Sequence, residues 1–401
     1  MYVERDIAGR FESIFKVYNM VALVGARQAG KTTFLKEQMR ARSASYVLFD
    51  DPDARSMFEA DIKKFESQYV EGYELAVLDE VQYCKDAGPK LKYLVDVGRR
   101  LWITASSEIL LGKEVLSHLV GRVSVLRLHP FNLGEFTRAK GQRELTPEIL
   151  HRMISEHATF GGYPKVVLTD GTEMKKTILR DLYETMLLKD VARTFAIDDI
   201  RALEHLGRYL AVNAGSLLSY QALSDNLGLS FQTVRKYIAA MEKSYLVTLI
   251  RPFYTNKGKE ISKSPRVYFL DIGLRNVIAN EFKAEPDGRT FENYVLTELV
   301  KLSHPIRFWR TKAKAEVDFV VERPGGLAPI EVKLACSSDQ VTRGMRSFIE
   351  RYTPDEAFVV FYRGEERQRK VGNCRVRFTD VSGLATALGQ ETDSTRSLDQ
   401  R

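Results

Sequence analysis

A glycine-containing motif near the start of the chain constrains the fold more than any other feature. Residues 25–32 read GARQAGKT and fit the pattern G-x-x-x-x-G-K-[ST]. The short apolar run 20–24 (MVALV) precedes the motif, and the helix-forming segment 33–42 follows it. A strand, this loop and a helix in that order are typical of the phosphate-binding loop of nucleotide-binding proteins. A glycine-rich turn that fits the pattern by chance is the alternative interpretation.

The residue types in this loop match the chemistry of a phosphate site. Gly25 and Gly30 let the backbone bend so that successive amides point at phosphate oxygens, and the helix N-terminus adds partial positive charge. Lys31 would reach the β- and γ-phosphates of ATP, and Thr32 would hold Mg²⁺. The expected nucleotide contacts are Gly25, Ala26, Arg27, Gln28, Ala29, Gly30, Lys31, Thr32 and Thr33.

A second acidic position lies at the end of another apolar strand. Residues 73–78 (YELAVL) form a near-continuous apolar run, which is typical of a strand buried in a parallel sheet. The run ends in Asp79 and Glu80. Asp79 would bind Mg²⁺ through water, and Glu80 would orient and deprotonate the attacking water. Alternatively, the acidic strand end only caps the following segment.

Two further polar positions are candidates for the same site. The strand-like run 100–105 (RLWITA) ends at Ser106 and Ser107, and we favour Ser106 as the group that senses the γ-phosphate. Ser107 is the alternative sensor, or it caps the next helix. Arg122 precedes another strand-like run and would act as an arginine finger or sensor that neutralises the transferred phosphoryl group. It is otherwise a surface arginine at the start of a strand.

The segments GARQAGKT, LAVLDEVQ, WITASS and GRVSVLRLHPFNLGEF resemble a prokaryotic AAA-type ATPase family. Its members carry a C-terminal domain long labelled as being of unknown function. The resemblance covers almost the whole chain, including FGGYPKVV at 160–167. It implies a five-stranded parallel sheet with helices on both faces, and a homo-oligomer, by analogy a hexameric ring in which a neighbour supplies the arginine finger. Ala105 stands where the family usually has glycine, which weakens the sensor assignment.

Residues 201–270 have the element order of a winged helix-turn-helix. Two expected helices, the second closed by Gly228, precede a third helix capped by Ser230, and two β-rich runs follow. Residues 201–266 contain ten lysines and arginines against four acidic residues. Such a basic surface suits DNA, although a winged helix used only for protein packing is the alternative. The expected DNA contacts are Arg235 and Lys236 on the third helix, and Lys257, Lys259 and Lys263 on the wing. The expected buried face of that helix comprises Phe231, Val234, Ile238 and Met241.

The C-terminal part has the element order of a nuclease-like fold. An expected helix carries Glu292, one strand carries Asp318, and the next carries Glu331 and Lys333, two residues apart and therefore on one face. This order resembles the PD-(D/E)xK nuclease site. Asp318 and Glu331 would hold Mg²⁺, Lys333 would stabilise the attacking water or the phosphorane charge, and Glu292 would complete the metal sphere. A structural Glu331–Lys333 pair, or a fold that only binds nucleic acid, are the alternatives.

Length and composition limit the class of protein. The chain has 401 residues, which corresponds to two to four domains at about 100–200 residues each. It lacks a run of about 18 uncharged apolar residues, so we expect no membrane-spanning helix. Charged residues near the start disfavour a signal peptide, and three scattered cysteines suit reduced thiols, so we expect a cytoplasmic protein. The net charge of +7 permits a polyanionic partner.

The complete interpretation is an α/β protein in four parts. We expect an AAA-type ATPase core at 1–140, a helical lid at 141–200, a winged helix at 201–270 and a restriction-endonuclease-like α/β domain at 271–387, followed by a disordered tail at 388–401. The expected function is an ATP-driven motor that acts on DNA, with ATP and Mg²⁺ as cofactors. A signal-transducing ATPase switch that regulates a protein partner is one alternative, and a metal-dependent nuclease whose assembly is regulated by ATP is another.

Overall fold

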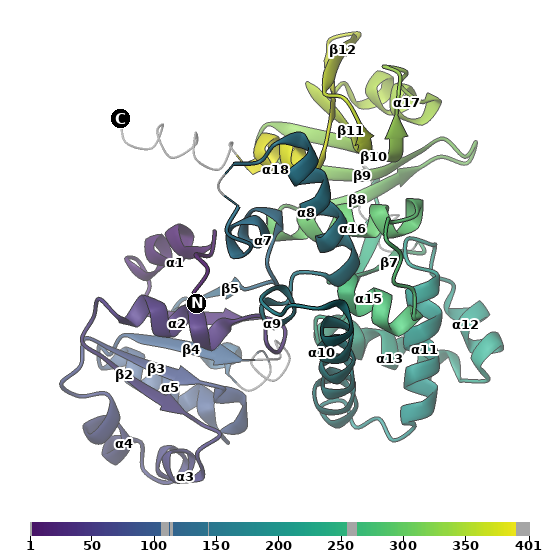
Figure 1. Ribbon diagram of the computed structural model, residues 1–401. Coiled ribbons are helices and arrows are strands. Elements are labelled where there is room, and N and C mark those ends of the chain that lie inside the picture. Colours follow the sequence, from purple (N-terminus) through teal and green to yellow (C-terminus); the bar gives the residue numbers. More distant parts are fainter. Residues whose placement is uncertain (1, 106–111, 113–114, 143, 255–262, 390–401) are drawn as a thin grey trace.

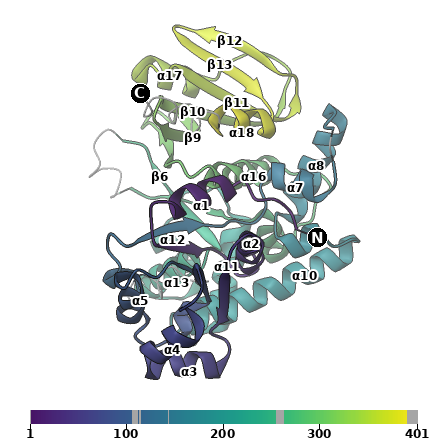
Figure 2. The same cartoon turned by 90° about the vertical axis from the view of Figure 1, so that its left-hand side faces the viewer.

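The computed structural model (Figure 1) describes residues 2–105, 112, 115–142, 144–254 and 263–389. Within these residues one sheet has five strands and another has eight. Figure 1 shows the N-terminal sheet at the lower left, the helices α10 to α13 at the lower right and the C-terminal sheet at the top. Figure 2 shows the same arrangement after a quarter turn, with the β12–β13 hairpin farthest from the N-terminal sheet.

The N-terminal sheet is parallel throughout and has the strand order β2-β3-β4-β1-β5. Its three central strands are completely buried, as expected for a parallel sheet covered on both faces. The expected five-stranded parallel sheet is therefore confirmed. The strands are β1 (Met20–Val24), β2 (Ala44–Leu48), β3 (Leu75–Asp79), β4 (Leu101–Ala105) and β5 (Val123–Arg127).

Helices cover both faces of this sheet. Alternate residues of β1 belong to different hydrophobic clusters, with Val21 and Leu23 in one and Ala22 and Val24 in the other. The first cluster includes side chains of α1 (Ala8–Phe15) and α2 (Lys31–Met39). The second includes side chains of α3 (Pro52–Ala60), α4 (Ile62–Tyr69) and α5 (Ala87–Asp96). Among the described residues of this part there are also two short 3-10 helices, η1 (Val81–Tyr83) and η2 (Leu116–His118).

A series of helices follows the sheet, as the sequence predicted. The helix α10 runs directly into a π-helix, η3, so the two form one continuous rod. Side chains of η3 and α13 share the hydrophobic cluster that covers one face of the N-terminal sheet. The helices are α7 (Leu133–Ala139), α8 (Pro147–Phe160), α9 (Pro164–Val167), α10 (Thr172–Thr185), η3 (Met186–Arg193), α11 (Ile200–Val212), α12 (Tyr220–Leu227) and α13 (Phe231–Lys243).

The region expected to be a winged helix has the predicted order of elements. Gly228 ends α12 in the left-handed conformation, and the Ser230 side chain caps α13. The strands β6 (Val247–Pro252) and β7 (Arg266–Phe269) then pair antiparallel. One detail of the prediction is wrong: Phe231, in the first turn of α13, is 39% exposed. The buried face consists of Val234, Tyr237, Ile238, Ala240 and Met241.

The C-terminal sheet has the strand order β12-β13-β11-β10-β9-β8-β6-β7. Strands β8, β9 and β10 pair antiparallel, and β10 pairs parallel with β11. Because β6 pairs with β8, the hairpin of the preceding region extends this sheet across the boundary that the sequence suggested at residue 270. The strands are β8 (Ile306–Arg310), β9 (Glu316–Arg323), β10 (Gly326–Cys336), β11 (Glu356–Gly364), β12 (Arg367–Val371) and β13 (Cys374–Thr379).

Four helices accompany this sheet. The helix α15 (Ile272–Ala279) contacts α8, α10 and α11, and α16 (Gly288–Lys301) contacts β10. The helix α17 (Arg343–Tyr352) contacts β9 and β10, and α18 (Val381–Gly389) contacts β11 and β13. Most of the expected tail, from residue 390, lies outside the described residues. In the part of the chain that the structure describes, no helix combines the length and the apolar character that crossing a membrane requires.

Candidate functional site

The phosphate-binding loop connects β1 to α2 at the carboxyl edge of the N-terminal sheet. Gly25 has φ 146°, and a Cβ on it would lie 2.2 Å from the carbonyl oxygen of Leu128. Gly30 has φ 100° and stands at the N-cap of α2. Side chains at both positions would be strained, which explains the glycines of the motif.

Lys31 lies in the floor of this loop. Its side chain is buried, and Nζ donates hydrogen bonds to the carbonyl oxygens of Gly25, at 2.8 Å, and Ala26, at 3.1 Å. Burial lowers the pKa of Lys31, whereas the carboxylates of Glu80 and Asp79 raise it. A buried ammonium aimed into the loop is suited to neutralising phosphate oxygens.

Asp79 gathers three hydroxyl groups from three different elements. Thr32 Oγ1 donates to its Oδ2 at 2.7 Å, and the Tyr46 hydroxyl donates to the same oxygen at 2.5 Å. Thr104 Oγ1 donates to the other carboxylate oxygen and accepts a hydrogen bond from the backbone N–H of Glu80 at 2.9 Å. The two expected Mg²⁺ ligands, Thr32 and Asp79, therefore lie side by side.

Sequence reasoning missed Tyr46 and Thr104. Tyr46 lies within β2, and Thr104 is the penultimate residue of β4, on either side of the strand that ends at Asp79. Their hydroxyl groups meet at Asp79 because β3 lies between β2 and β4. The polar Thr104 in an otherwise apolar strand was the one available signal.

Lys31 and Thr32 border a cavity of about 500 Å³. Glu80 also lines it, has a left-handed backbone (φ 62°) and accepts a hydrogen bond from the Gln82 side-chain amide. Pro164 and Lys165 also line the cavity, at the start of α9, and were not expected there. The full lining is Arg27, Gln28, Gly30, Lys31, Thr32, Thr33, Glu80, Pro164 and Lys165.

The donor groups around Asp79 fit a bound magnesium ion. Mg²⁺ prefers oxygen ligands and commonly uses one or two carboxylates together with water and substrate phosphates. The hydroxyl of Thr32 and the carboxylate of Asp79 supply oxygens of this kind within one hydrogen bond of each other. Thr32 and Asp79 are thus the residues that would hold Mg²⁺.

The two remaining ATPase candidates have different outcomes. Ser106 lies outside the described residues. Arg122 immediately precedes β5, and its guanidinium pairs with Asp96, with Nε and Oδ1 2.6 Å apart. The phosphate-binding loop follows Val24, which pairs with Arg127 at the far end of β5. Five strand residues at about 3.3 Å each separate the two edges by about 16 Å, so Arg122 does not reach the cavity of its own chain.

The expected nuclease residues lie on α16, β9 and β10. Ile330 pairs with Phe319, so the next residues, Glu331 and Asp318, are neighbours across the two strands. Asp318 Oδ2 accepts a hydrogen bond from the backbone N–H of Val332 at 2.8 Å. Burial raises the pKa of Asp318 to about 7, and the nearby carboxylates of Glu292 and Glu331 add to this effect. The acidic side chains therefore lie close enough to repel one another.

Each of the other two carboxylates already has protein partners. Glu331 is buried and pairs with Lys333 Nζ at 2.6 Å, and it accepts a hydrogen bond from Thr342 at 2.5 Å. Glu292 accepts a hydrogen bond from the hydroxyl of Tyr268 at 2.6 Å. Among the described residues, no group of three or more acidic, histidine or cysteine side chains is arranged to hold a metal ion.

A buried arginine compensates the negative charge of this region. Arg266, the first residue of β7, is 6% exposed. Its guanidinium pairs with Glu316, and its Nη1 lies 3.4 Å from Glu292 Oε1. Asp318 is also within electrostatic reach of Arg266. Sequence reasoning counted Arg266 only as part of a basic region and did not place it among these acids.

Comparison with known protein families gives three matches along the chain. Residues 17–137 match the AAA domain family. This range contains both the phosphate-binding loop and Asp79. The chain contains an AAA-type P-loop domain. Residues 151–285 and 287–381 match two families that are each described as a domain of unknown function (DUF8612 and DUF4143).

Related proteins extend over most of the chain. An uncharacterized protein of Mycobacterium tuberculosis is 28% identical over 382 residues, which cover 92% of this chain and 82% of that protein. An uncharacterized protein of Haemophilus influenzae is 25% identical over 340 residues, covering 79% and 83%. The Walker-type ATPase of Pyrococcus abyssi is 14% identical, with a TM-score of 0.46, and the match covers 69% of this chain and 96% of that one. A variant of RuvB from Thermotoga maritima has a TM-score of 0.34 and 14% identity over 65% and 94%.

Several expected DNA contacts lie on the surface beyond the AAA domain. Arg235 and Lys236 are exposed on α13, although Lys236 Nζ donates to the carbonyl oxygen of Ala196 at 2.9 Å. Lys263 is exposed just before β7. Lys257 and Lys259 lie outside the described residues.

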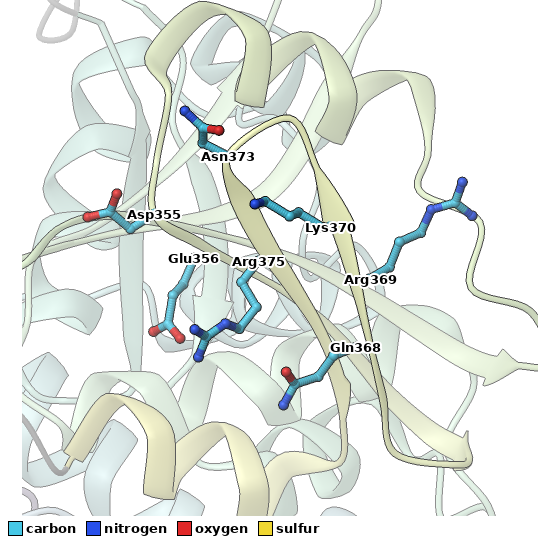
Figure 3. Close-up of a pocket in the computed structure, with 7 residues that line it drawn as sticks. All are labelled: Asp355, Glu356, Gln368, Arg369, Lys370, Asn373 and Arg375. Atoms are coloured by element: carbon cyan, nitrogen blue, oxygen red, sulfur yellow. The ribbon is translucent and has the colours of Figure 1, made fainter.

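The basic hairpin β12–β13 forms a second charged surface, far from the AAA domain (Figure 2). A cavity of about 590 Å³ lies beside the hairpin. Figure 3 shows Lys370 and Arg375 on the two strands of the hairpin, with Glu356 beside Arg375. Arg369 pairs with Asp339 at 3.0 Å. Two further basic side chains are likewise paired: Arg363 of β11 with Glu285, and Arg377 of β13 with Glu356. The lining mixes both signs of charge: Asp355, Glu356, Gln368, Arg369, Lys370, Asn373 and Arg375.

Proposed function

We propose that this protein is an ATP-hydrolysing AAA-type motor that acts on DNA, by remodelling, unwinding or branch processing. We further propose that its C-terminal nuclease-like domain binds DNA. The observation that carries the ATPase part is the cluster around Asp79. One carboxylate holds the hydroxyl of the loop residue Thr32 and the hydroxyl of Thr104, which in turn fixes the backbone of Glu80. Thr32 and Glu80 line the same cavity as Lys31.

The chain's own residues would divide the work of hydrolysis. The loop amides and Lys31 would bind the β- and γ-phosphates, and Thr32 and Asp79 would hold Mg²⁺, which when bound neutralises charge on the phosphate oxygens. Glu80 would orient the attacking water and accept its proton. The Gln82 amide already engages Glu80 Oε2 and would restrict the carboxylate to one orientation. Lys165, at the rim of the cavity, would add a cation from the helical region.

We also propose that the protein forms a ring-shaped homo-oligomer, by analogy a hexamer. The position of Arg122 supports this proposal. By analogy, a motor of this kind takes an arginine finger from a neighbouring subunit, and Arg122 is too far from the cavity of its own chain to act there. It lies at the opposite edge of the sheet, where it pairs with the exposed Asp96. A surface arginine of this kind is available to the cavity of a neighbouring subunit.

Charge and fold together support DNA as the partner. The region 201–266 has six more basic than acidic residues. Arg235 and Lys236 project from α13, the third of the three helices, where a winged helix presents its recognition helix. The order of helix α16, three antiparallel strands, helix α17 and a parallel strand agrees with a nuclease-like fold. We infer that this domain binds DNA without cutting it, because Arg266 and Tyr268 already engage Glu292.

A signal-transducing ATPase switch that regulates a protein partner is the second candidate. The Arg266–Glu292 ion pair favours this switch, because a nuclease-like domain whose helix carboxylate is paired with arginine suits a protein-docking role as well as DNA binding. The two candidates differ in one measurable property. A motor on DNA should hydrolyse ATP faster when DNA is present, whereas the switch should hydrolyse ATP at the same rate with and without DNA.

The deciding experiment measures ATP turnover with single-stranded, duplex and branched DNA, and without DNA. Lys31→Ala serves as the ATPase-deficient control, and the DNA is examined on a gel after each reaction. Stimulation by one of these DNA structures, together with binding of that DNA, supports the motor. ATP turnover that does not respond to DNA, in a protein without DNA affinity, supports the switch and rejects the motor.

A further inference from the structure

The phosphate-binding loop is clamped to the helical region by a long-range ion pair. Arg27, the third residue of the loop motif, donates from Nε to both carboxylate oxygens of Asp190, at 3.2 and 3.1 Å, and from Nη2 to Oδ1 at 2.9 Å. Asp190 is 163 residues away in the sequence and lies in the π-helix η3. Two-nitrogen contacts of this kind are the strong form of the arginine–carboxylate pair.

The position of Arg27 makes it more than a structural partner. Its side chain is 23% exposed and lines the same cavity as Lys31, Thr32 and Glu80. The guanidinium is close enough to depress the pKa of Lys31, while Asp190 acts on it in the opposite direction. Two cations thus face the space that a polyphosphate would fill, and one of them is neutralised by Asp190.

Opening of the Arg27–Asp190 pair would affect other elements, because Asp190 is buried and is linked to α13. Its side chain is only 7% exposed, and its backbone carbonyl accepts a hydrogen bond from Ser244 Oγ at 2.7 Å. Ser244 caps the C-terminus of α13, the helix that carries Arg235 and Lys236. A buried carboxylate that loses its cation is strongly unfavourable, so departure of Arg27 would favour movement of Asp190 toward solvent or another partner. Turns of π-helix are also rare and often occur at functional sites.

We propose that Arg27 exchanges partners when a nucleoside triphosphate binds: it leaves Asp190 for the terminal phosphate, and the freed Asp190 forces η3 to move. The inference rests on the proposed binding of ATP and adds a route from the nucleotide to α13. A terminal phosphate competes well because it carries more negative charge than a carboxylate and binds the arginine fork in the same geometry. A diphosphate lacks the group that would draw Arg27 away.

The exchange predicts opposite effects for the two halves of the pair. Asp190→Asn releases Arg27 and should tighten binding of a slowly hydrolysed ATP analogue on the order of tenfold, a usual size for coupling between two sites. Arg27→Ala should weaken it by a similar factor, and the double variant should behave like Arg27→Ala. ADP binding should change much less in each. Asp181→Asn removes an exposed carboxylate of α10 and should leave both affinities unchanged, which controls for net charge.

Calorimetric titration of full-length protein with the ATP analogue and with ADP measures these affinities. Weaker binding by Asp190→Asn would overturn the proposal, because the pair would then only hold the loop in shape. Tighter binding that persists in the double variant would overturn it too, since the gain would not pass through Arg27.

Hydrogen exchange on the wild-type protein gives a test that no folding defect can obscure. The amides of residues 186–193 should exchange faster with the ATP analogue than with ADP. Equal or slower exchange contradicts the proposal. The outcome is separate from the DNA question: a wild-type protein that binds the analogue but ignores DNA rejects the motor and leaves the exchange of Arg27 testable, whereas a protein that binds neither nucleotide rejects both.

Discussion

Thr104 donates a hydrogen bond to the carboxylate of Asp79 and accepts one from the backbone N–H of Glu80, 2.9 Å away. A single buried hydroxyl thus positions both acidic residues of the proposed ATPase site. Thr104 is completely buried, so no water can take over either hydrogen bond when the hydroxyl is removed. The side chain acts through its neighbours, and we regard it as a positioning residue.

Replacing Thr104 with valine keeps the shape and removes both hydrogen bonds. Groups that hold a metal ligand in place typically contribute about 10- to 100-fold to activity, so we expect kcat to fall by roughly this factor when Asp79 and Glu80 lose this partner. The KM for ATP should change less, because the loop that binds the phosphates is intact. Thr137→Val is a matched control, since Thr137 is also buried but donates to the carbonyl oxygen of Gly134 in its own helix. A kcat equal to that of wild type would show that Thr104 does not position Glu80.

Lys31→Ala should abolish ATP turnover, because the loop loses its charge on the β- and γ-phosphates. Glu80→Gln should still bind ATP yet hydrolyse it very slowly, since only activation of the water is lost. Nucleotide binding and phosphate release, measured separately for each variant, distinguish the two effects. Wild-type turnover by Glu80→Gln would mean that another residue activates the water.

Residues of this site that belong to one continuous motif could be predicted from the sequence. Residues that meet there only through the order of strands in the sheet could not. The loop from Gly25 to Thr32 follows from its own sequence, because the glycines and the lysine are needed at fixed spacing. The acid at Asp79 follows from an apolar run that ends in a carboxylate. Tyr46 reaches Asp79 only because the sheet places β2 beside β3, and nothing in the sequence fixes that order.

Contacts between distant segments account for the other surprises. No local pattern indicates that Arg27 pairs with Asp190, or that Arg266 reaches Glu292, because each pair joins elements that meet only through tertiary packing. Periodicity also misplaced Phe231. The residue has the right spacing for the apolar face of α13, but it stands in the first turn of the helix, beyond the end of the core.

Arg235→Ala should weaken DNA binding and flatten its salt dependence. Binding releases fewer counterions when a phosphate contact is lost. The slope of log K against log salt should therefore become shallower by about 0.9 for each lost contact on duplex DNA. Arg235 is the cleaner choice, because the neighbouring Lys236 also bonds to the backbone of Ala196. Arg40→Ala, at the exposed end of α2, removes the same charge and should leave the slope unchanged. An unchanged slope for Arg235→Ala would instead favour a protein-packing role for this helix.

The C-terminal domain should bind DNA without cutting it, even in the presence of Mg²⁺. Asp318 and Glu331 lie next to each other, but Glu292 is held by Arg266 and Tyr268 rather than turned to a common ion. Labelled branched DNA should therefore remain intact on a denaturing gel while the ATPase is active. Metal-dependent cleavage that disappears in Asp318→Ala and in Lys333→Ala, with ATP turnover preserved, would contradict this and establish a working nuclease.

His157 should make the junction between the AAA domain and α16 sensitive to acid. Its Nε2 lies 3.1 Å from the carbonyl oxygen of Phe131 and its Nδ1 3.1 Å from the hydroxyl of Tyr294. A carbonyl can only accept, so Nε2 carries the proton and Nδ1 accepts from Tyr294. Burial holds the pKa of His157 well below 6.5, and the nearby Lys301 lowers it further. The folded protein thus keeps this imidazole neutral.

The sign of the effect follows from where protons bind. Below pH 6.5 the unfolded chain takes up a proton on His157 and the folded chain does not, so the free energy of unfolding falls as the pH decreases. The contribution is about 1.4 kcal/mol for each pH unit until the pKa of the folded state is reached. His157→Gln, which can donate to Phe131 and accept from Tyr294, should lose less thermal stability than wild type between pH 7 and pH 5. His118→Gln, which removes an exposed histidine, should follow the wild-type curve. Parallel curves for wild type and His157→Gln would show that the folded protein protonates this imidazole as readily as the unfolded chain does.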